Sequence, residues 1–391
     1  MLSVRGATVY TGKDVVYDAI INFDHTTIVD ISNTKLGEMV GEFEVITPAF
    51  IDPHCHIGMR RAGEPSSEEE TNEKMDAFTI LAKALDSVQM DDSSFQDSVE
   101  AGVLYSCVLP GSGNILGGRS AVIRNYGKTT TEAFISQAPS SIKAAVGYNP
   151  MSTHEWKGTR PHTRMGSMAL LREKLYAVKS KLGKKRTTEE EKEEKGVCLS
   201  REEEIIRDIL YGKELLRVHV HKTDDIESVL RLVDEFHELN ADFKISVTVD
   251  HACDVHEIDV FNTLRERGIA VVYGPMDSLA YKVELKHEGW RNIKYLLSSD
   301  VTYGLMTDHP VILQRMLLFQ LRWFIRMGVT KHQAIRVITH NNANILGLGA
   351  ILGTLEKNKW ASFLCWNGDP FDMTRYPVTV YGEGKLLFQL L

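Results

Sequence analysis

Apolar and polar positions alternate along the chain in two different ways. In the middle of the sequence, short apolar runs are separated by longer amphipathic stretches, which is typical of repeated βα units around a parallel sheet. The apolar runs predict strands over residues 103–109, 141–146, 215–220, 245–249, 270–273 and 303–306. The amphipathic stretches predict helices over residues 226–239, 257–266, 311–326 and 331–339.

Both ends of the chain show a shorter pattern, in which strand-like runs are broken by turn residues. These runs cover residues 4–9, 19–23 and 27–31 at one end, and residues 362–366, 378–381 and 385–388 at the other. The two ends can therefore pair into one β domain. The α/β middle has close to eight βα units, and its polar, His-rich positions follow the strands. We therefore expect a (β/α)8 TIM barrel rather than an open doubly wound sheet.

Composition and charge narrow the class of protein. The 391 residues are 43% hydrophobic and 25% charged, which is the profile of a folded soluble protein and excludes disordered and collagen-like chains. The 45 Lys and Arg residues against 53 Asp and Glu give a net charge of -8. We therefore expect neither a nucleic acid partner nor an anionic membrane surface, and a small-molecule substrate suits this balance better.

Cysteine usage and hydropathy bear on location. No uncharged apolar stretch approaches the roughly 18–20 residues that span a bilayer, and residues 1–30 lack a basic region followed by an apolar run. The five cysteines have no CxxC spacing, and their odd number leaves at least one unpaired. We therefore expect a cytoplasmic protein with reduced thiols and no membrane segment.

The segment 50–56 (FIDPHCH) carries the sharpest chemical signal. An apolar strand ends there in His54 and His56. Side chains of a strand alternate, so positions i and i+2 face the same way and both imidazoles can meet one metal ion. An HxH pair also occurs by chance, so a metal site requires further ligands.

Further candidate ligands stand at later strand ends. His219 and His221, then His251, then Asp308 each lie at or just after a predicted strand. The carboxyl ends of barrel strands form one face, so these side chains are expected to converge. Imidazole together with carboxylate is a suitable ligand set for Zn²⁺ or a related divalent ion. The sequence therefore predicts a metal site on this face.

These motifs resemble those of the amidohydrolase superfamily. The resemblance rests on the strings at 45–57 (VITPAFIDPHCHI), 307–310 (TDHP) and 344–348 (NILGL), together with the later His positions. More narrowly, the strings at 110–118 (PGSGNILGG), 219–226 (HVHKTDDI) and 364–371 (LCWNGDPF) resemble the branch related to imidazolonepropionase. The resemblance covers nearly the whole chain.

The resemblance implies a fold and a ligand set. It implies a metal-bearing barrel of residues 48–349, flanked by a small composite β-sandwich of residues 1–47 and 350–391. The positions that match the family's metal ligands are His54, His56, His219, His251 and Asp308. Asp308 also matches the family's general base, a role that suits a carboxylate beside a metal-activated water. The implied cofactor is one or two divalent metal ions, with Zn or Mn expected.

The group that bridges two ions is left open. Many relatives place a carboxylated Lys or a Glu on the fourth strand, and Tyr148 stands where the branch has Glu. Lys143 can bridge if it is carboxylated, or it can form an ion pair at the lower end of the barrel. Cys107 offers a thiolate, or is plain packing. Glu70 and Glu73 are further carboxylates near the site, or solvated loop residues.

Several other residues are candidates for contact with substrate. His221 shares a face with the metal ligands, so it can bind substrate, support the transition-state oxyanion or contact a metal. Arg160 and Arg164 can clamp a carboxylate, or they can make structural ion pairs. Lys222 is a further anion-binding candidate, and Tyr148 can donate a hydrogen bond.

We therefore expect a metal-dependent hydrolase of an amide or cyclic amide C–N bond, with a small-molecule substrate, in a homo-oligomer. A metallodipeptidase acting on short peptides is the alternative among enzymes. A catalytically lapsed metal-binding barrel with a regulatory or assembly role is the alternative of another class, motivated by Tyr148 and by the stretch 356–361 (EKNKWA). The highly charged segment 184–195 predicts an exposed helix extension or mobile loop, with a substrate-covering lid as the alternative.

Overall fold

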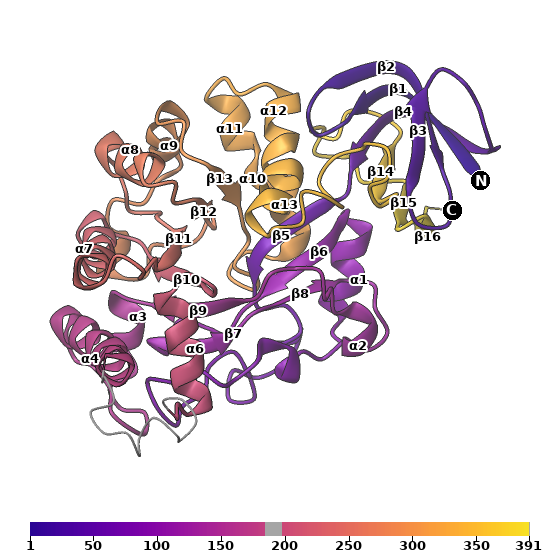
Figure 1. The fold of residues 1–391 in the computed structure, drawn as a ribbon. Coiled ribbons are helices and arrows are strands. Elements are labelled where there is room, and N and C mark those ends of the chain that lie inside the picture. Colours follow the sequence, from indigo (N-terminus) through magenta and orange to yellow (C-terminus); the bar gives the residue numbers. More distant parts are fainter. Residues whose placement is uncertain (184–197, 391) are drawn as a thin grey trace.

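The computed structural model describes residues 1–183 and 198–390. The fold is mixed α/β, and its strands form three sheets. Figure 1 shows a sheet made from both chain ends on one side and a larger body of alternating strands and helices on the other. The charged segment 184–195 lies outside the described residues. Within the described part of the chain, every helix is too short or too polar to cross a membrane.

The sheet at the chain ends has seven strands in the order β16-β15-β14-β4-β1-β2-β3. Its strands are β1 (Leu2–Tyr10), β2 (Val15–Phe23), β3 (Ile28–Ser32), β4 (Glu38–Pro48), β14 (Phe363–Trp366), β15 (Thr379–Gly382) and β16 (Lys385–Gln389). The antiparallel pair β4–β14 joins the two ends, and the only parallel pair in this sheet is β1–β4. The rings of Phe23, Phe363 and Tyr381 pack together on its inner side.

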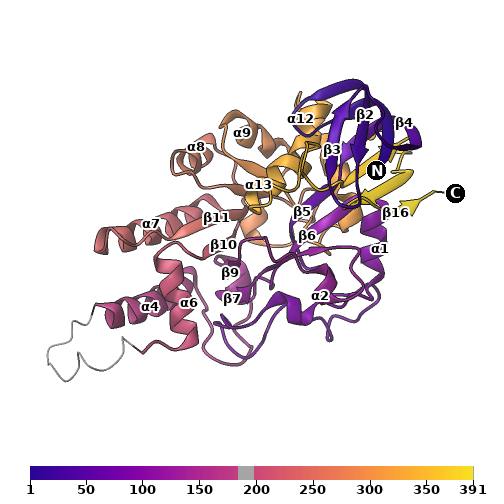
Figure 2. The same cartoon turned by 45° about the vertical axis from the view of Figure 1, so that its right-hand side comes forward.

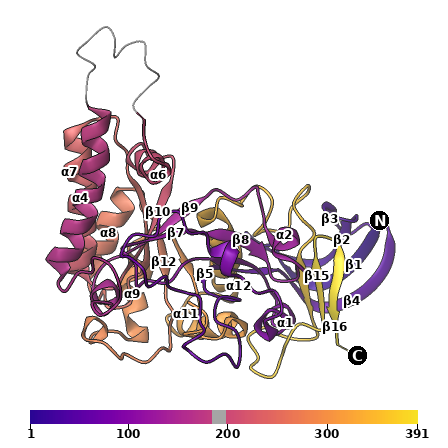
Figure 3. The same ribbon diagram turned by 90° about the horizontal axis from the view of Figure 1, so that it is seen from below.

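The two ends therefore pair, as their strand patterns predicted, but through a single ladder. In the described residues β4 links both sets of strands in one continuous sheet, so the two facing sheets of a sandwich are not established. Figure 3 shows this sheet at one end of the molecule, with both termini beside it. Because β4 ends at Pro48 and β5 begins at Phe50, the chain passes almost directly from this sheet into the larger body. The domain boundaries at 47/48 and 349/350 stay a prediction.

The larger body has its strands in two arcs. One arc is a three-stranded sheet of β5 (Phe50–Cys55), β6 (Val103–Val108) and β8 (Ala121–Arg124). The other contains β7 (Leu116–Arg119), β9 (Ser141–Ala145), β10 (Leu215–Val220), β11 (Ser246–His251), β12 (Val271–Tyr273) and β13 (Tyr303–Leu305). Neighbouring strands from β9 to β13 are parallel and follow chain order, as are β5 and β6.

The described strands do not form the closed ring of eight parallel strands that the sequence predicts. Between β6 and β9 the chain instead makes β7 and β8, which pair antiparallel with β9 and β6. The chain reverses between the end of β6 at Val108 and the start of β7 at Leu116. Within β7 the register against β9 shifts at Gly118, whose φ is +114° and where a Cβ atom would lie 2.4 Å from the carbonyl oxygen of Ala82. Only glycine tolerates both conditions.

On the opposite side, the two arcs meet through hydrogen bonds outside the ladders. The backbone N–H of His56 donates to His309 O at 2.9 Å, and that of Asp308 donates to His54 O at 3.1 Å. The side chain of Asn342 donates to backbone carbonyls of both β5 and β13. The ends of β5 and β13 are therefore held side by side, which brings the first and last predicted metal ligands together.

Helices cover the outside of the arcs, as Figure 2 shows for α7, α8 and α9. They are α1 (Ser93–Glu100), α2 (Thr130–Ala133), α3 (Tyr148–Met151), α4 (Arg164–Leu182), α6 (Arg201–Leu210), α7 (Thr223–Leu239), α8 (Ile258–Glu266), α9 (Ile293–Ser298), α10 (Leu317–Gln320), α11 (Arg322–Arg326), α12 (Lys331–Arg336) and α13 (Asn342–Ile345). Local sequence explains several starts: Ser200 with Glu203, and Thr330 with Gln333, form capping boxes at α6 and α12.

The single helix predicted over residues 311–326 is wrong. The structure has two short helices there, α10 and α11, after a turn at Val311 and Ile312. The backbone N–H groups of these two residues donate to Asp308 O and Thr307 O, at 2.8 and 3.2 Å. They therefore fix the loop that carries a candidate catalytic residue instead of starting a helix.

Candidate metal centre

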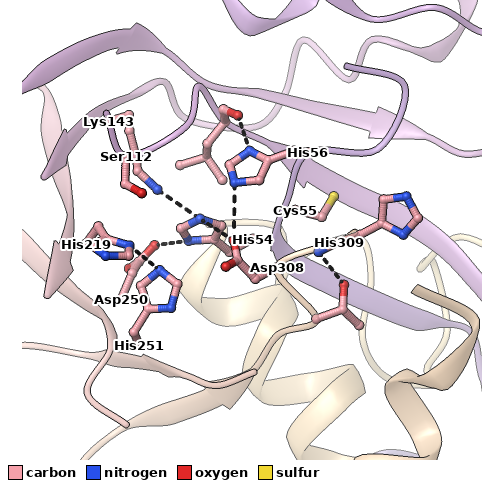
Figure 4. A network of polar contacts seen from close by, with 12 residues as sticks. His54, Cys55, His56, Ser112, Lys143, His219, Asp250, His251, Asp308 and His309 are labelled. Carbon is pink, nitrogen blue, oxygen red and sulfur yellow. Dashed lines mark hydrogen bonds and ion pairs between the residues drawn. The ribbon is translucent and has the colours of Figure 1, made fainter. Parts of the chain in front are cut away.

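Side chains from several strands meet at the carboxyl ends of the two arcs, and Figure 4 shows most of them pointing toward one another. Most come from the last residues of β5, β9, β10 and β11, or from the residues that directly follow β5, β10 and β13. They are His54, His56, Lys143, His219, His221, Asp250, His251 and Asp308. Nearly all are buried, so the cluster lies within the body rather than on an open surface.

The first group of possible ligands is His54, His251 and Asp308. One ligand atom from each lies within 4.8 Å of the others. Asp308 Oδ1 is 3.5 Å from His54 Nε2 and 3.2 Å from His56 Nε2. The two imidazoles of the HxH pair therefore face one carboxylate, as the alternation of strand side chains predicts.

The second group is His219, His221 and His251, and it consists only of imidazoles. His219 Nδ1 lies 2.6 Å from His251 Nε2. His219 Nε2 and His221 Nδ1 are buried and have no hydrogen-bond partner among the described residues. A buried polar atom without a partner carries a desolvation cost, which a bound cation would relieve. The residues of this cluster therefore fit a divalent metal ion, and His251 belongs to both groups.

His54 is oriented by a buried ion pair behind it. Asp250 Oδ2 lies 2.6 Å from His54 Nδ1. The same carboxylate accepts hydrogen bonds from Arg217 Nε and Nη2, at 3.1 and 2.8 Å. Because Asp250 occupies Nδ1, the other ring nitrogen, Nε2, is left facing the cluster. A carboxylate behind a ligating imidazole is a common way to fix its tautomer and orientation.

His56 and His251 are oriented by backbone carbonyls. His56 Nδ1 lies 2.7 Å from Leu109 O, and His251 Nδ1 lies 2.9 Å from Gly274 O. Each contact engages Nδ1 and leaves Nε2 facing the other clustered side chains.

Hydrogen bonds to the buried Asp52 hold the loop that carries Asp308. Asp52 accepts a hydrogen bond from the hydroxyl of Thr307 and another from Gln314 Nε2 at 3.0 Å. Asp308 itself has a left-handed backbone, with φ of 50°. This conformation is uncommon for residues other than glycine, although Asp and Asn adopt it more readily than most. The buried Asp52 network therefore holds Asp308 in a conformation that points its carboxylate at the histidines.

A family model described as "Amidohydrolase family" matches residues 162–387, which is more than half of the chain. The chain belongs to the amidohydrolase family. This confirms the resemblance at the level of the family, whereas the imidazolonepropionase-related branch stays a prediction. The matched region begins after His54 and His56, and it includes His219, His251 and Asp308.

Other comparisons agree with this family. The chain is 26% identical over 365 residues to "Amidohydrolase tasK" of Hapsidospora irregularis; the match covers 88% of this chain and spans 36% of that relative's length. A crystal structure of an amidohydrolase from Thermotoga maritima has a TM-score of 0.90 and 28% identity over all of both chains. A Xaa-Pro dipeptidase structure with bound methionine, at 13% identity, has a TM-score of 0.60 over 99% of each chain and shows the fold alone.

The clustered histidines His54, His219, His221 and His251 are held neutral. Burial lowers the pKa of His219, His221 and His251 well below the usual value. Burial and then the charge of Lys143 lower the pKa of His54 to about 4. Neutral imidazole is the form that binds a metal ion. These ligands are therefore available without loss of a proton.

Asp308 is held as a carboxylate. Burial alone would raise its pKa, but the interaction with His251, followed by the hydrogen bond from His56, outweighs burial and lowers the pKa. A charged carboxylate beside neutral imidazoles completes a ligand set suited to Zn²⁺. The same group is the candidate base.

Lys143 lies inside the cluster. Its side chain is fully buried, and Nζ is 2.9 Å from His54 Nε2. Burial lowers its pKa to about 8, so roughly a tenth of the amine is neutral at pH 7. A neutral amine is the form that can be carboxylated. This position favours the bridging role over an ion pair at the lower end of the body, and that role stays a proposal.

Cys107 is close to the cluster but turned toward Arg217, whose Nη1 lies 3.6 Å from its Sγ. Burial raises the pKa of this thiol, which disfavours the thiolate. Among the described residues, Cys107 is in neither group of possible ligands. Glu70 and Glu73 line a separate cavity of about 630 Å³ and are likewise outside both groups.

The predicted anion-binding arginines have partners within the protein. Arg160 is buried and donates hydrogen bonds to the backbone carbonyls of Lys157, Gly113 and Glu73. It therefore braces the loop after β9. Arg164 instead lines a cavity of about 400 Å³ and pairs with the Asp225 carboxylate at 2.9 Å. Contact of either residue with substrate stays a prediction.

Lys222 and Tyr148 lie at the starts of two helices and not among the buried ligands. Lys222 precedes α7, and its Nζ is 3.3 Å from Asp224 Oδ2. Tyr148 begins α3 and is 41% exposed, and its backbone N–H donates to Glu284 Oε2 at 2.7 Å. Tyr148 therefore supplies no buried ligand in place of the missing Glu.

Lys282 and Glu284, which sequence reasoning missed, lie between β12 and α9. Both are buried, with Lys282 Nζ 2.7 Å from Glu284 Oε1 and 2.8 Å from Asn149 Oδ1. The charge of Lys282 helps to lower the pKa of His219 and His221, so its ammonium lies near the second group. The sequence pattern that could have identified them is an alternation in which the two charged residues are buried and the apolar residues around them point outward. These are Leu279, Tyr281 and Val283, which are 80%, 66% and 81% exposed.

Proposed function

We propose that this chain is a metal-dependent amidohydrolase that hydrolyses an amide or cyclic amide C–N bond of a small molecule. The observation that carries the proposal is the second imidazole group, in which His219 and His221 each have a buried nitrogen without a partner, beside the Asp308 carboxylate. The family match and the Thermotoga maritima amidohydrolase structure support it.

The residues that would hold one or two divalent ions are the clustered ligands already described. His54, His56, His251 and Asp308 would serve one position, and His219 with His221 the other, with Lys143 as the candidate bridge. When bound, such an ion supplies a Lewis acid that polarises a carbonyl and lowers the pKa of a water molecule.

The protein's own groups then move the protons. Asp308 accepts a proton from the attacking water, whose oxygen adds to the carbonyl carbon, and returns it to the nitrogen as the C–N bond breaks. His56 Nε2, 3.2 Å from Asp308 Oδ1, keeps that carboxylate in place. If His221 does not hold an ion, its Nδ1, which has no partner among the described residues, would carry a proton and donate a hydrogen bond to the carbonyl oxygen of the substrate. The products are a carboxylic acid and an amine.

A metallodipeptidase is a second candidate function, and Lys282 favours it. The Lys282 ammonium is buried close to His219 and His221, where it can meet the terminal carboxylate of a short peptide. Asn149 and Glu284 fix its direction. A substrate with a carboxylate near the scissile bond would make use of this charge.

The finer predictions from the sequence belong to this proposal. The two arcs would serve as the (β/α)8 barrel, and the terminal sheet would be the composite β-sandwich. The metal would be Zn or Mn. The chain would act as a homo-oligomer in the cytoplasm and belong to the imidazolonepropionase-related branch. Metal analysis of the purified protein and its mass in solution test the metal and the oligomer.

The decisive experiment compares Asp308→Asn with Asp300→Asn. Both aspartates have left-handed backbones, with φ of 50° and 55°, and Asn tolerates that conformation, so the two changes are matched. Against a panel of dipeptides, N-acyl amino acids and cyclic amides, we expect Asp308→Asn to lower kcat by about 10³-fold. It should retain its metal, and Asp300→Asn should match the wild type.

Two results would contradict the proposal. Protein grown with Zn²⁺ or Mn²⁺ that carries no divalent metal, together with an unchanged rate in Asp308→Asn, would exclude the metal-dependent mechanism. A fully loaded wild type without turnover of any substrate in the panel would favour the lapsed metal-binding barrel instead.

A further inference from the structure

A second cluster of ligand side chains lies apart from the catalytic one. Asp254 and His256 stand between β11 and α8, and His287 stands between β12 and α9. One ligand atom from each lies within 4.8 Å of the other two. In the described part of the chain, this cluster shares no residue with the two groups of the metal centre.

Asp254 fixes the geometry of this cluster. Its side chain is buried, and Oδ1 accepts a hydrogen bond from the backbone N–H of His287 at 2.7 Å. Its Oδ2 lies 3.3 Å from His287 Nδ1. His256 Nδ1 lies 2.8 Å from the backbone oxygen of Asp254. One buried carboxylate and its own backbone therefore orient both imidazoles.

The two imidazoles lie against each other and can be reached from solvent. Their ring centroids are 4.3 Å apart, and their planes are inclined at 44°. The His256 and His287 side chains are 41% and 42% exposed. A hydrogen bond from His287 to Asp254 is enough to join the two loops. His256 is not needed for this contact, so its position beside His287 provides an additional possible ligand.

We propose that Asp254, His256 and His287 bind a divalent transition-metal ion at a peripheral site, separate from the catalytic cluster. Two imidazoles and one carboxylate form a ligand set that Zn²⁺ uses with a water in the fourth position. Mg²⁺ and Ca²⁺ prefer oxygen ligands, so this site selects against them. Imidazole ligands also suit Ni²⁺ and Cu²⁺, and the general order of affinities places Cu²⁺ first.

The site has a structural consequence. His287 belongs to the same segment as the buried Lys282 and Glu284, whereas Asp254 and His256 belong to the loop after β11. A metal ion bound by residues of both the segment and the loop would hold them together. Opening of the segment would then require loss of a ligand, so an occupied site reduces local opening.

The first test measures zinc stoichiometry. The exposed thiol of Cys198 could bind zinc by itself, so all variants carry Cys198→Ser. Protein with its catalytic sites already loaded is dialysed against ZnCl₂, and bound metal is counted. We expect one more zinc equivalent in the parent than in His256→Ala/His287→Ala, and no extra equivalent with MgCl₂.

A matched control is available in a second pair of exposed imidazoles. His154 and His162 have ring centroids 5.2 Å apart but no buried carboxylate between them. His154→Ala/His162→Ala should keep the extra equivalent. Equal zinc stoichiometry and affinity in the parent and in His256→Ala/His287→Ala would overturn the proposal.

A second measurement does not depend on counting. Zinc should slow amide hydrogen exchange over residues 277–289 in the parent, and should leave it unchanged in His256→Ala/His287→Ala. Exchange in this segment that is unaffected by zinc in the parent contradicts the tie between the loops. Both readouts are independent of turnover, so they hold whether or not the proposed hydrolysis is correct.

Discussion

The two halves of the candidate metal centre are held in place by different kinds of interaction. In the half that contains His54, His56 and Asp308, each imidazole has one nitrogen on a protein acceptor and the other facing the carboxylate. In the half that contains His219 and His221, two buried ring nitrogens have no partner in the described structure. The first half is complete by itself, whereas the second half needs a bound group.

The balance of charge differs in the same way. Around His54 the negative charges of Asp250 and Asp308 are balanced by the positive charges of Arg217 and Lys143. Around His219 the ligands are neutral, because burial lowers their pKa values well below the usual range. One half is therefore prearranged by ion pairs, and the other is a set of neutral donors. Because the two halves differ in this way, mutations can change the orientation of the ligands and their affinity for metal separately.

The largest effect is expected from His219→Ala. Loss of this ligand should weaken binding of one metal equivalent by more than the roughly 10–100-fold that loss of a supporting residue costs. His54, His56 and Asp308 should keep their positions, because their hydrogen bonds and ion pairs do not include His219, whereas His251 loses its contact with His219 Nδ1. Metal titration measures the affinity, and His25→Ala, at an exposed turn, is the control. Unchanged metal content in His219→Ala would show that the second half is not a ligand group.

An intermediate effect is expected from Asp250→Asn. The change removes the charge that orients His54 and leaves Arg217 buried without its partner. We expect metal affinity to fall roughly 10–100-fold, and stability to fall by about 3–5 kcal/mol because a buried pair is broken. Calorimetry and denaturant unfolding measure the two effects, with the exposed Asp242→Asn as the control.

Arg217→Lys sharpens this result. It retains a positive charge but loses the two-point contact with Asp250, so most of the metal affinity should remain. If Asp250→Asn loses stability but no metal affinity, then Asp250 acts only in folding, and the first half does not depend on it for ligand orientation.

The smallest effect is expected from Lys282→Met. The residue lies at the edge of the second half, and its loss should raise KM by about tenfold for carboxylate-bearing substrates, equal to about 1.4 kcal/mol. The kcat value should change little, since Lys282 takes no part in the proposed proton transfer. Steady-state kinetics with charged and amidated dipeptides checks this, and the exposed Lys286→Met is the control. An equal KM change for amidated substrates would argue against recognition of a carboxylate.

The sequence predicts the ligands better than it predicts what holds them. His54, His219 and Asp308 could be found because polar residues that follow apolar strands stand out in the pattern. Asp250 and Arg217 could not be assigned a role, because they lie within strands and meet only through the register of β10 against β11. A charged residue in a buried strand is a signal, but its partner depends on three-dimensional pairing.

The same limit applies to the fold. The parallel strands from β9 to β13 lie within two residues of their predicted bounds, because buried strands give clear apolar runs. The antiparallel β7 and β8 were missed, since their runs are short and the chain reverses between Val108 and Leu116, which the βα pattern does not contain. The amphipathic stretch at 311–326 gave the wrong element because its first amides bind the Asp308 loop.

The joint between β5 and β13 determines when each half of the cluster can assemble during synthesis. Asp52 and Thr307, which meet at that joint, are 255 positions apart, whereas His219 and His251 are 32 positions apart on neighbouring strands. Contacts between distant residues carry the larger chain-closure cost and form late. All three imidazoles of the second group are synthesised before Asp308, and their strands can pair with no contribution from the last part of the chain. During synthesis the Asp308 carboxylate is the last ligand of the cluster to be added.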